Sequence, residues 1–375
     1  MKIALVHDYL NEFGGAERVL KTLIEIYPKA PIYTAFKVRG STADKEFKGK
    51  EIKESFLAPL LKIDNFYSPL RFLTPLIWKS MDLSSYDLVI TSSSWYITRG
   101  FKVRTKDLPA GRQAKVICYC HTPPRWLYGY QTSVGFTKYW PVKVYAAIVG
   151  HFMRMYDFKS AQTVDHWIAN SKNVQARIRK FYRKESTVIY PPVDVERIIK
   201  AAKSLDKENY FLIVSRLVGA KGLEEVAKAA KKHGFKLKIV GEAHGFSDVE
   251  ANLKKLSGGN VELLGRVSDA ELYELYGKAK GFIALAREED FGITPVEAMA
   301  AGTPVIAFNG GGFRESVIDG ETGILIDGTD EETISKAVSK LNTLKWDKNK
   351  LQNQAKKFSK ERFKKQMREF VKNHA

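Results

Sequence analysis

The chain has 375 residues, of which 44% are hydrophobic and 27% charged, and its formal net charge is +19. This length and composition predict a soluble globular protein with two domains of ordinary size. No apolar run reaches about 18 residues, which excludes a membrane-spanning helix, and the apolar start of residues 1–8 is too short for a signal peptide. The only cysteines, Cys118 and Cys120, match no metal or disulfide pattern, so we expect buried thiols in a cytoplasmic protein.

The excess positive charge lies mostly in residues 1–200. Such a basic half suggests an anionic partner, which is a membrane surface, a nucleic acid or a phosphate-bearing substrate. The simpler interpretation is that the charge only keeps the protein soluble.

The N-terminal half begins with a predicted strand at residues 2–7, followed by a loop and a helix that ends near Tyr27. Gly14 and Gly15 stand where the loop becomes the helix. Glycines at such a turn let backbone amides approach a phosphate, although a tight turn alone explains them equally well. Further strands are expected at 88–92, 115–120, 166–171 and 187–190, and the Pro- and Gly-containing stretch 108–113 reads as a surface loop.

Two segments of this half are rich in aromatic and basic residues. Residues 56–79 show no clean period, and residues 126–160 mix Trp, Tyr, Phe and Met with Lys and Arg. The second segment predicts either a helical face for a membrane interface or an apolar acceptor, or a helix packed inside the domain. The sequence does not decide between these alternatives.

His121 follows the strand at 115–120 and precedes a Pro-Pro turn. This position, at the carboxyl end of a buried strand, suits a side chain that contacts a ligand. A lone histidine there is also compatible with a structural role.

A double proline at 191–192 and a restart of α/β alternation place the domain boundary near residues 190–207. Beyond it the pattern predicts alternating strands and helices, hence a second doubly wound parallel sheet. The expected strands are 210–214, 236–240, 261–264, 281–285, 304–307 and 323–326. The expected helices are 221–233, 247–256, 269–278, 295–301, 313–318, 331–342 and 348–373.

Two cations flank the loop that leaves the strand at 210–214. Arg216 and Lys221 suit a pyrophosphate, because the guanidinium gives planar contacts and the ammonium a point charge. A surface lysine at a helix start is the alternative for Lys221. The sequence has no Walker motif, and no G-x-G-x-x-G follows the first strand, so nucleotide hydrolysis and dehydrogenase chemistry lose support.

The stretch 287–300 carries three acids, a Phe-Gly turn and a helix start at the end of a buried strand. We expect Thr294 to cap the helix and Glu297 to complete a capping box. One interpretation is that Glu297 only caps its helix while the acids lie in solvent. The other is that Glu289 and Glu297 both face a ligand rich in hydroxyl groups, with the helix amides taking its phosphates.

These residues occur together in one order: Gly14-Gly15, His121, Arg216, Lys221, and Glu289 with seven residues before Glu297. In this arrangement the chain resembles the retaining glycosyltransferases of family 4, over nearly its whole length. The stretches 118–123 and 289–293 look most like the branch that uses GDP-mannose. The resemblance implies a GT-B architecture, in which two Rossmann-like doubly wound α/β domains face a cleft. It implies an N-terminal acceptor domain at 1–195, a nucleotide-sugar domain at 196–355, and a C-terminal helix, 356–375, that packs back on the first domain.

The resemblance also implies a role for each candidate residue. Arg216 and Lys221 would hold the donor diphosphate, Glu297 the ribose, and Glu289 the hydroxyls of the donor sugar. His121 would contact that sugar from the N-terminal domain. Other backbone and side-chain contacts to the donor would come from Gly14, Gly15, Arg266, Val267, Phe291, Gly292, Ile293 and Thr294. The catalytic set would then be Glu289, His121, Arg216 and Lys221.

The resulting prediction is a transferase that moves a hexose, mannose from GDP-mannose, to a glycan or polyprenyl-linked acceptor. No metal is expected, because the resemblance implies a metal-independent enzyme and the chain has no Asp-x-Asp. The basic, aromatic N-terminal domain predicts peripheral contact with an anionic membrane at its cytoplasmic face. The alternatives are a same-fold glucosyltransferase or epimerase using a UDP- or ADP-sugar, and a non-catalytic protein that binds carbohydrate or nucleic acid. No nucleic-acid motif supports the last, and the acids at 288–290 argue against it.

Overall fold

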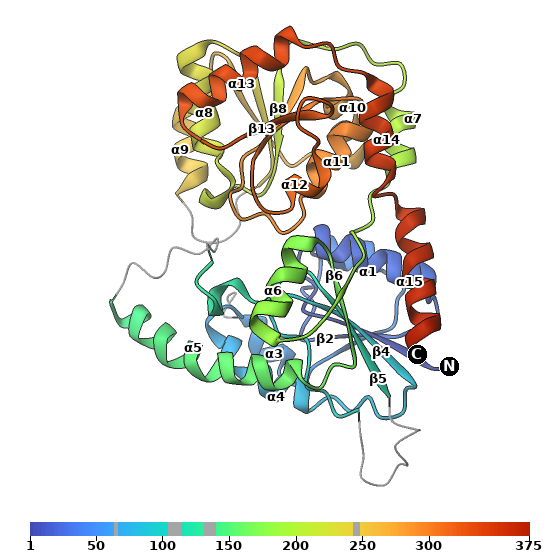
Figure 1. Ribbon diagram of the computed structural model, residues 1–375. Coiled ribbons are helices and arrows are strands. Elements are labelled where there is room, and N and C mark those ends of the chain that lie inside the picture. The colour runs from blue at the N-terminus through green and yellow to red at the C-terminus, as the bar shows by residue number, and fades with distance from the viewer. Residues whose placement is uncertain (64–66, 104–113, 131–139, 243–247) are drawn as a thin grey trace. The chain divides into compact units, whose positions relative to one another are not determined.

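The computed structural model describes residues 1–63, 67–103, 114–130, 140–242 and 248–375 (Figure 1). The described chain divides into two compact units. Unit 1 contains residues up to Pro192 together with the C-terminal segment Phe363–Ala375, and unit 2 contains Val193–Arg362. The expected surface loop at 108–113 lies outside the described residues. Among the described residues, no helix combines the length and the apolar character needed to cross a bilayer.

Unit 1 is built on a seven-stranded sheet, within the described residues, in the order β3-β2-β1-β4-β5-β6-β7. Every pair of neighbours is parallel, so each connection must cross over one face of the sheet. The strands are β1 (Ile3–His7), β2 (Ile32–Thr34), β3 (Ile52–Glu54), β4 (Leu88–Ser93), β5 (Lys115–Cys120), β6 (His166–Ala169) and β7 (Thr187–Val188).

The helices of unit 1 are α1 (Gly15–Ile26), α2 (Thr42–Glu46), α3 (Ala58–Leu61), η2 (Pro69–Leu73), α4 (Thr74–Lys79), η4 (Arg125–Leu127), α5 (Trp140–Ala161), α6 (Lys172–Tyr182) and α15 (Lys360–His374). Helix α1 buries Val19, Leu20, Leu23 and Ile24, which recur at helical spacing. Helix α6 begins as expected after the capping residue Ser171, whose hydroxyl accepts from the amide of Val174.

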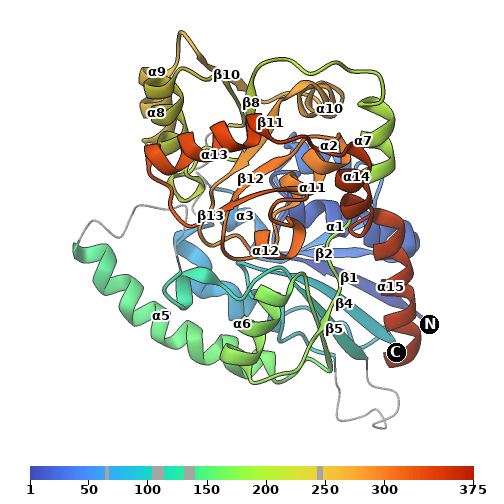
Figure 2. The ribbon, with the colours of Figure 1, turned by 45° about the horizontal axis from the view of Figure 1, so that its top comes forward.

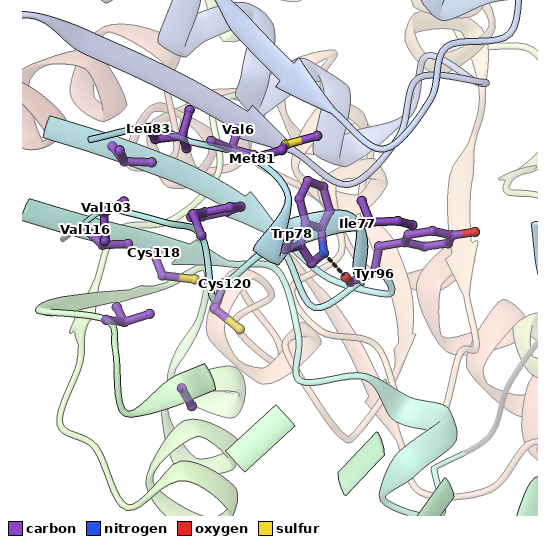
Figure 3. Close-up of a cluster of buried hydrophobic side chains, with 14 of the residues drawn as sticks. Val6, Ile77, Trp78, Met81, Leu83, Tyr96, Val103, Val116, Cys118 and Cys120 are labelled. Atoms are coloured by element: carbon purple, nitrogen blue, oxygen red, sulfur yellow. Dashed lines mark hydrogen bonds between the residues drawn. The ribbon is translucent and has the colours of Figure 1, made fainter. Parts of the chain in front are cut away.

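One face of this sheet packs on a cluster around Trp78, whose indole N–H donates to the backbone oxygen of Tyr96 at 2.6 Å (Figure 3). Cys118 and Cys120 belong to the same cluster, and both are buried free thiols, as expected. The opposite face packs on α1 and on the C-terminal helix α15 through Phe363 and Met367. Unit 1 therefore has two apolar layers, one of which is completed by the end of the chain.

Unit 2 holds a second parallel sheet, six-stranded in the described chain, in the order β10-β9-β8-β11-β12-β13. Its strands are β8 (Phe211–Val214), β9 (Leu237–Val240), β10 (Val261–Gly265), β11 (Gly281–Ala284), β12 (Val305–Phe308) and β13 (Gly323–Ile326). Its helices are α7 (Val195–Ala201), η6 (Gly219–Lys221), α8 (Leu223–His233), α9 (Val249–Leu256), α10 (Asp269–Lys278), α11 (Ile293–Ala300), α12 (Phe313–Ser316), α13 (Glu331–Thr343) and α14 (Lys348–Lys356). Two parallel-sheet, Rossmann-like units confirm the predicted fold class.

The single helix expected over 348–373 is wrong. The chain forms α14 up to Lys356 and α15 from Lys360, and the turn that connects them is held by backbone hydrogen bonds to Val193. The amide of Lys360 donates to the backbone oxygen of Val193 at 2.9 Å. The amide of Val193 in turn donates to the backbone oxygen of Phe358 at 3.1 Å. These bonds to a distant segment take backbone groups that a continuous helix would have used internally.

Candidate active site

The sheet of unit 2 reverses its strand order between β8 and β11. From β8 the chain builds outward through β9 and β10, and it then returns to add β11 on the other side of β8. Open α/β sheets bind ligands at the carboxyl ends of the strands where the order reverses. The loops that leave β8 and β11 therefore form the candidate site of this unit, and both carry residues that the sequence singled out.

Lys221 and Glu289 meet at this reversal. The ammonium Nζ of Lys221, from the loop after β8, lies 2.5 Å from Oε2 of Glu289, from the loop after β11, and both side chains are mostly buried. Gly222 permits this approach, because it has a φ of +70° and a Cβ there would lie 2.8 Å from Cβ of Leu285. The sequence placed both charged groups in the site, but it did not predict that they pair.

Arg216 lies on the same loop as Lys221, immediately after β8, and its side chain is exposed. The loop bends back at once, because the amide of Val218 donates to the backbone oxygen of Arg216 at 2.9 Å. The loop therefore presents two cations within six residues, one held by a carboxylate and the other open to solvent.

The loops that leave β8, β9 and β10 lie side by side at the carboxyl edge of the sheet. Arg266 lies in the loop after β10. The amide of Leu217 donates to the backbone oxygen of Glu242 at 3.0 Å, and the carboxylate of Glu242 lies 3.8 Å from Arg266. Gly241 has no room for a side chain, since a Cβ would lie 1.9 Å from the backbone oxygen of Ser215. Arg266 and the half-buried Val267 thus lie two strands away from Arg216, on the same sheet edge.

The predicted capping box at the start of α11 is wrong. The helix begins at Ile293 after Gly292, whose φ of +85° turns the chain into the helix two residues earlier than expected. Thr294 is then the second helical residue and Glu297 the fifth, so neither can cap. Glu297 is instead 5% exposed and accepts a hydrogen bond from the hydroxyl of Tyr276 on α10 at 2.9 Å. Glu297 thus bonds to Tyr276, whereas Glu289 pairs with Lys221.

A glycine loop, Gly310–Gly312, completes the site and was missed in the sequence. The amide of Gly312 donates to the backbone oxygen of Glu289 at 2.9 Å. A Cβ on Gly311 would lie 2.4 Å from that same oxygen, and one on Gly312 would lie 2.3 Å from Cα of Phe291. Three consecutive glycines after the buried strand β12 are the signal that identifies this contact, because only a chain without side chains fits against the acidic loop.

Unit 1 repeats the topology, with its reversal between β1 and β4. The strand register aligns His7, the last residue of β1, with Ser92 of β4. His121 directly follows the neighbouring strand β5. Three polar side chains thus gather at the carboxyl edge, of which the sequence identified only His121.

These three side chains form a hydrogen-bonded chain that ends on a carboxylate. Oγ of Ser92 lies 2.7 Å from Nε2 of His121 and 3.0 Å from Nδ1 of His7, and Nε2 of His7 lies 3.2 Å from Oε1 of Glu17. Burial, with a smaller contribution from His7, lowers the pKa of His121 to about 3. His121 is therefore a neutral imidazole at physiological pH.

Gly14 and Gly15 join this chain at the helix start, where the sequence expected them. Gly14 precedes α1, Gly15 is its first residue, and the amide of Gly14 donates to Oε2 of Glu17 at 2.9 Å. Glu17 therefore connects the amino terminus of α1 to His7 and so to His121. The two sets of candidate residues lie in different units, and within each unit the fold brings its own set to one sheet edge.

The chemistry of each set is limited by its groups. The cations of unit 2 suit phosphate oxygens, and its carboxylates suit hydroxyl donors. The neutral imidazole of unit 1 can donate or accept a hydrogen bond without carrying charge. Among the described residues, no group of three or more His, Cys, Asp or Glu side chains is arranged to hold a metal ion.

Two parallel, Rossmann-like units with polar residues at both strand-order reversals define the GT-B class of α/β protein. Two family models match the chain, Glycosyltransferase Family 4 over residues 13–197 and Glycosyl transferases group 1 over residues 194–362. Since the two models together span nearly the whole chain, the protein belongs to the GT-B glycosyltransferases of family 4 and group 1.

Individual relatives agree with this assignment. An uncharacterized glycosyltransferase of Methanocaldococcus jannaschii is 30% identical over 187 residues, covering 50% of this chain and 52% of its own. The O-antigen chain mannosyltransferase RfbU of Salmonella typhimurium is 30% identical over 195 residues, covering 49% and 53%. The chain thus spans about half the length of these curated relatives. The crystal structure of Anabaena Alr3699/HepE in complex with UDP-glucose shares the fold, with a TM-score of 0.68, 18% identity and 100% coverage of both chains.

Proposed function

We propose that this protein transfers a hexose from a nucleoside diphosphate sugar to a glycan or lipid-linked acceptor and retains the configuration of the anomeric carbon. The Lys221–Glu289 pair beside Arg216, at the strand-order reversal of unit 2, carries the proposal. It combines cations for a diphosphate with a carboxylate for sugar hydroxyls. The match of both halves of the chain to glycosyltransferase models supports it.

In the proposed reaction the bond between the anomeric carbon and the β-phosphate oxygen breaks, and the acceptor hydroxyl oxygen bonds to the same face of that carbon. The leaving phosphate oxygen takes the hydroxyl proton. Arg216 and Lys221 stabilise the charge that develops on the diphosphate, which is electrostatic catalysis and needs no metal ion. Glu289 accepts hydrogen bonds from the sugar and stabilises its developing positive charge.

The remaining residues position the donor in this proposal. Glu297 binds the ribose hydroxyls, with its carboxylate oriented by Tyr276, and Arg266 and Val267 lie near the base. The amides of Gly292–Thr294 approach the phosphates. From unit 1, Gly15 approaches the phosphates and His121 contacts the sugar, which requires the two units to close on the donor.

GDP-mannose is the proposed donor. The resemblance of residues 118–123 and 289–293 to the GDP-mannose branch supports this choice, as does the likeness to a mannosyltransferase. The alternative donor is a UDP-sugar, because the Anabaena protein of the same fold was crystallised with UDP-glucose.

A binding panel decides between the donors. Thermal unfolding of the protein is followed with GDP-mannose, UDP-glucose, UDP-N-acetylglucosamine and ADP-glucose. A ligand at about 100 times its Kd adds roughly 2.7 kcal/mol to the free energy of unfolding. We expect a shift with GDP-mannose that is lost in Lys221→Met and kept in Lys254→Met, since Lys254 pairs with Glu250 on the exposed surface of α9. A shift with UDP-glucose alone contradicts the proposal of GDP-mannose as the donor. The absence of a shift with every sugar nucleotide of the panel contradicts the proposed sugar transfer.

Retention and metal independence are tested on the product. Transfer of mannose in the presence of a chelator, with an α-linked product identified by NMR, agrees with the proposal. A β-linked product or a requirement for a divalent cation contradicts it.

A further inference from the structure

The exposed apolar side chains of this protein are concentrated in two segments of unit 1. Of the fifteen large hydrophobic residues that are exposed in the described chain, twelve lie in residues 56–76 and 140–158. We call these twelve the apolar face: Phe56, Leu60, Ile63, Phe72, Leu76, Trp140, Val144, Tyr145, Ile148, Phe152, Met155 and Phe158. Scattered exposed hydrophobics are ordinary on soluble proteins, whereas a concentration of this size marks an interaction site.

Helix α5 presents part of this face while its other side is firmly held. Towards unit 1, Met153 packs on Ile97 and Leu127, and Asp157 forms a fully buried ion pair with Arg99. On the outer side, Ile148 is 56% exposed and Phe152 64%. The sequence left open whether this helix was packed inside the domain or faced an interface, and the exposures favour the interface.

The two segments adjoin. The hydroxyl of Tyr145 on α5 donates to the backbone oxygen of Pro69, the first residue of η2, at 2.6 Å. Helix α4 continues directly from η2, so it belongs to the same stretch that contacts α5. In Figure 2, α5 lies at the left of unit 1 with its outer side uncovered by other elements of that unit.

Among the described residues of these two segments, every exposed charged side chain is positive. Residues 140–161 contain Lys143, Arg154 and Lys159, all exposed, and their only acid is the buried Asp157. Lys79 is exposed at the end of α4. An apolar surface bordered by cations complements an anionic lipid surface, whereas a second copy of the chain would bring like charges together. Trp140 and Tyr145 have rings suited to the boundary between headgroups and acyl chains.

We infer that the apolar face docks unit 1 onto an anionic lipid bilayer, with α5 lying in the plane of the membrane surface. Docking does not depend on the proposed sugar transfer, because it uses none of the residues of the candidate active site. It would hold unit 1 at the surface where a lipid-linked acceptor is found, and this consequence alone rests on the proposed function.

Vesicle co-sedimentation of the full chain tests the docking. We expect the protein to pellet with vesicles of phosphatidylcholine and phosphatidylglycerol, and much less with phosphatidylcholine alone. The double variant Ile148→Ser/Phe152→Ser should bind vesicles at least about tenfold more weakly than the wild-type protein, because it removes two apolar side chains from the contact. The variant Lys143→Glu/Lys159→Glu should lose the dependence of binding on salt.

The matched control is Ile318→Ser/Leu344→Ser, which removes two apolar side chains of 38% and 40% exposure from unit 2. It should bind vesicles like the wild-type protein. Circular dichroism and sugar-nucleotide binding, measured on all three double variants, separate loss of docking from loss of folding or of donor binding.

Two results overturn the inference. One is equal vesicle binding by the wild-type chain and Ile148→Ser/Phe152→Ser, or no binding at low salt. The other is a dimer in sedimentation velocity without lipid that Ile148→Ser/Phe152→Ser dissociates, which assigns the face to a second copy of the chain.

Discussion

Oγ of Ser92 lies 2.7 Å from Nε2 of His121 and 3.0 Å from Nδ1 of His7. A serine hydroxyl carries one proton, so it can donate to only one of the two rings and must accept from the other. When Glu17 accepts from Nε2–H of a neutral His7, Nδ1 of His7 accepts from Ser92, and Ser92 accepts from Nε2–H of His121. Nδ1 of His121 is then the unprotonated nitrogen. Because Ser92 can donate to only one ring, the tautomer of His7, whose Nε2 faces Glu17, determines the tautomer of His121.

The first prediction is that Ser92→Ala lowers kcat about tenfold with little change in KM, because His121 loses the partner that orients it. Its control is Ser93→Ala, which removes a neighbouring buried hydroxyl that accepts from the amide of Thr98 at 3.1 Å. Both variants should lower the free energy of unfolding by about 1–3 kcal/mol, since each leaves a buried group unpaired. Equal kcat values for the two variants would contradict the positioning role, and the ¹⁵N shifts of His121 report its tautomer directly.

The second prediction concerns pH. With a pKa of about 3, His121 should show no titration by NMR between pH 5 and 8. The unfolded chain binds a proton at this residue below about pH 6.5, whereas the folded chain does not until near pH 3. The free energy of unfolding should therefore fall as the pH drops through this window, by at most about 1.4 kcal/mol per pH unit for this group. That slope should decrease in His121→Gln and persist in His151→Gln, a change on the exposed surface of α5.

The sequence predicted most of this fold because its strands are short apolar runs between turn residues. β5 and β13, for example, match the expected ranges 115–120 and 323–326. The helix start at Gly292 was misplaced because the site is shaped by a distant residue: a Cβ there would lie 2.5 Å from Cε1 of Phe313, which lies in a different helix. Local propensity favoured Thr294 as the cap, and tertiary packing overrode it.

The candidate site was predictable where a residue follows a strand and carries charge, as Arg216, Lys221 and Glu289 do. The partners of His121 were not, because they depend on register. His7 aligns with Ser92 only through the pairing of β1 with β4, and no feature within either strand encodes that alignment. A polar residue at the end of each apolar strand was the available signal, and it identifies both.

The third prediction is that Lys221→Met lowers kcat for donor hydrolysis or transfer by about 10²–10³. The free energy of unfolding should also fall, by about 1–3 kcal/mol, because the change leaves the carboxylate of Glu289, which is only 19% exposed, without its counter-charge. Lys254→Met, which also removes a lysine from an ion pair, should leave kcat unchanged. A large loss of stability without a loss of kcat would make the pair structural.

The fourth prediction compares two glycines of positive φ. Gly292→Ala places a Cβ 2.5 Å from Cε1 of Phe313, whereas Gly259→Ala meets nothing within 4 Å. The change at Gly259 should cost about 1–2 kcal/mol for the left-handed backbone alone. The change at Gly292 should cost about 1–3 kcal/mol more from overpacking and should abolish donor binding by displacing the start of α11. Denaturant unfolding and calorimetric binding measure both, and similar effects at the two sites would contradict the close contact.

The fifth prediction concerns the ion pair of Arg99 and Asp157, whose side chains are both fully buried. Tyr128 also donates to Asp157, at 2.6 Å, so the carboxylate ties α5 both to the stretch after β4 that carries Arg99 and to the residue that ends η4. Asp157→Asn leaves the Arg99 guanidinium buried without its counter-charge and should lower the free energy of unfolding by about 3–5 kcal/mol. The same change in an exposed pair, Glu185→Gln opposite Arg179, should cost less than about 1 kcal/mol. Hydrogen exchange should then accelerate in α5 before it does in α6.

Equal losses of stability in Asp157→Asn and Glu185→Gln would show that α5 is held by its apolar contacts alone. Recovery of stability in Arg99→Met/Asp157→Leu would show that the unpaired charge causes the loss.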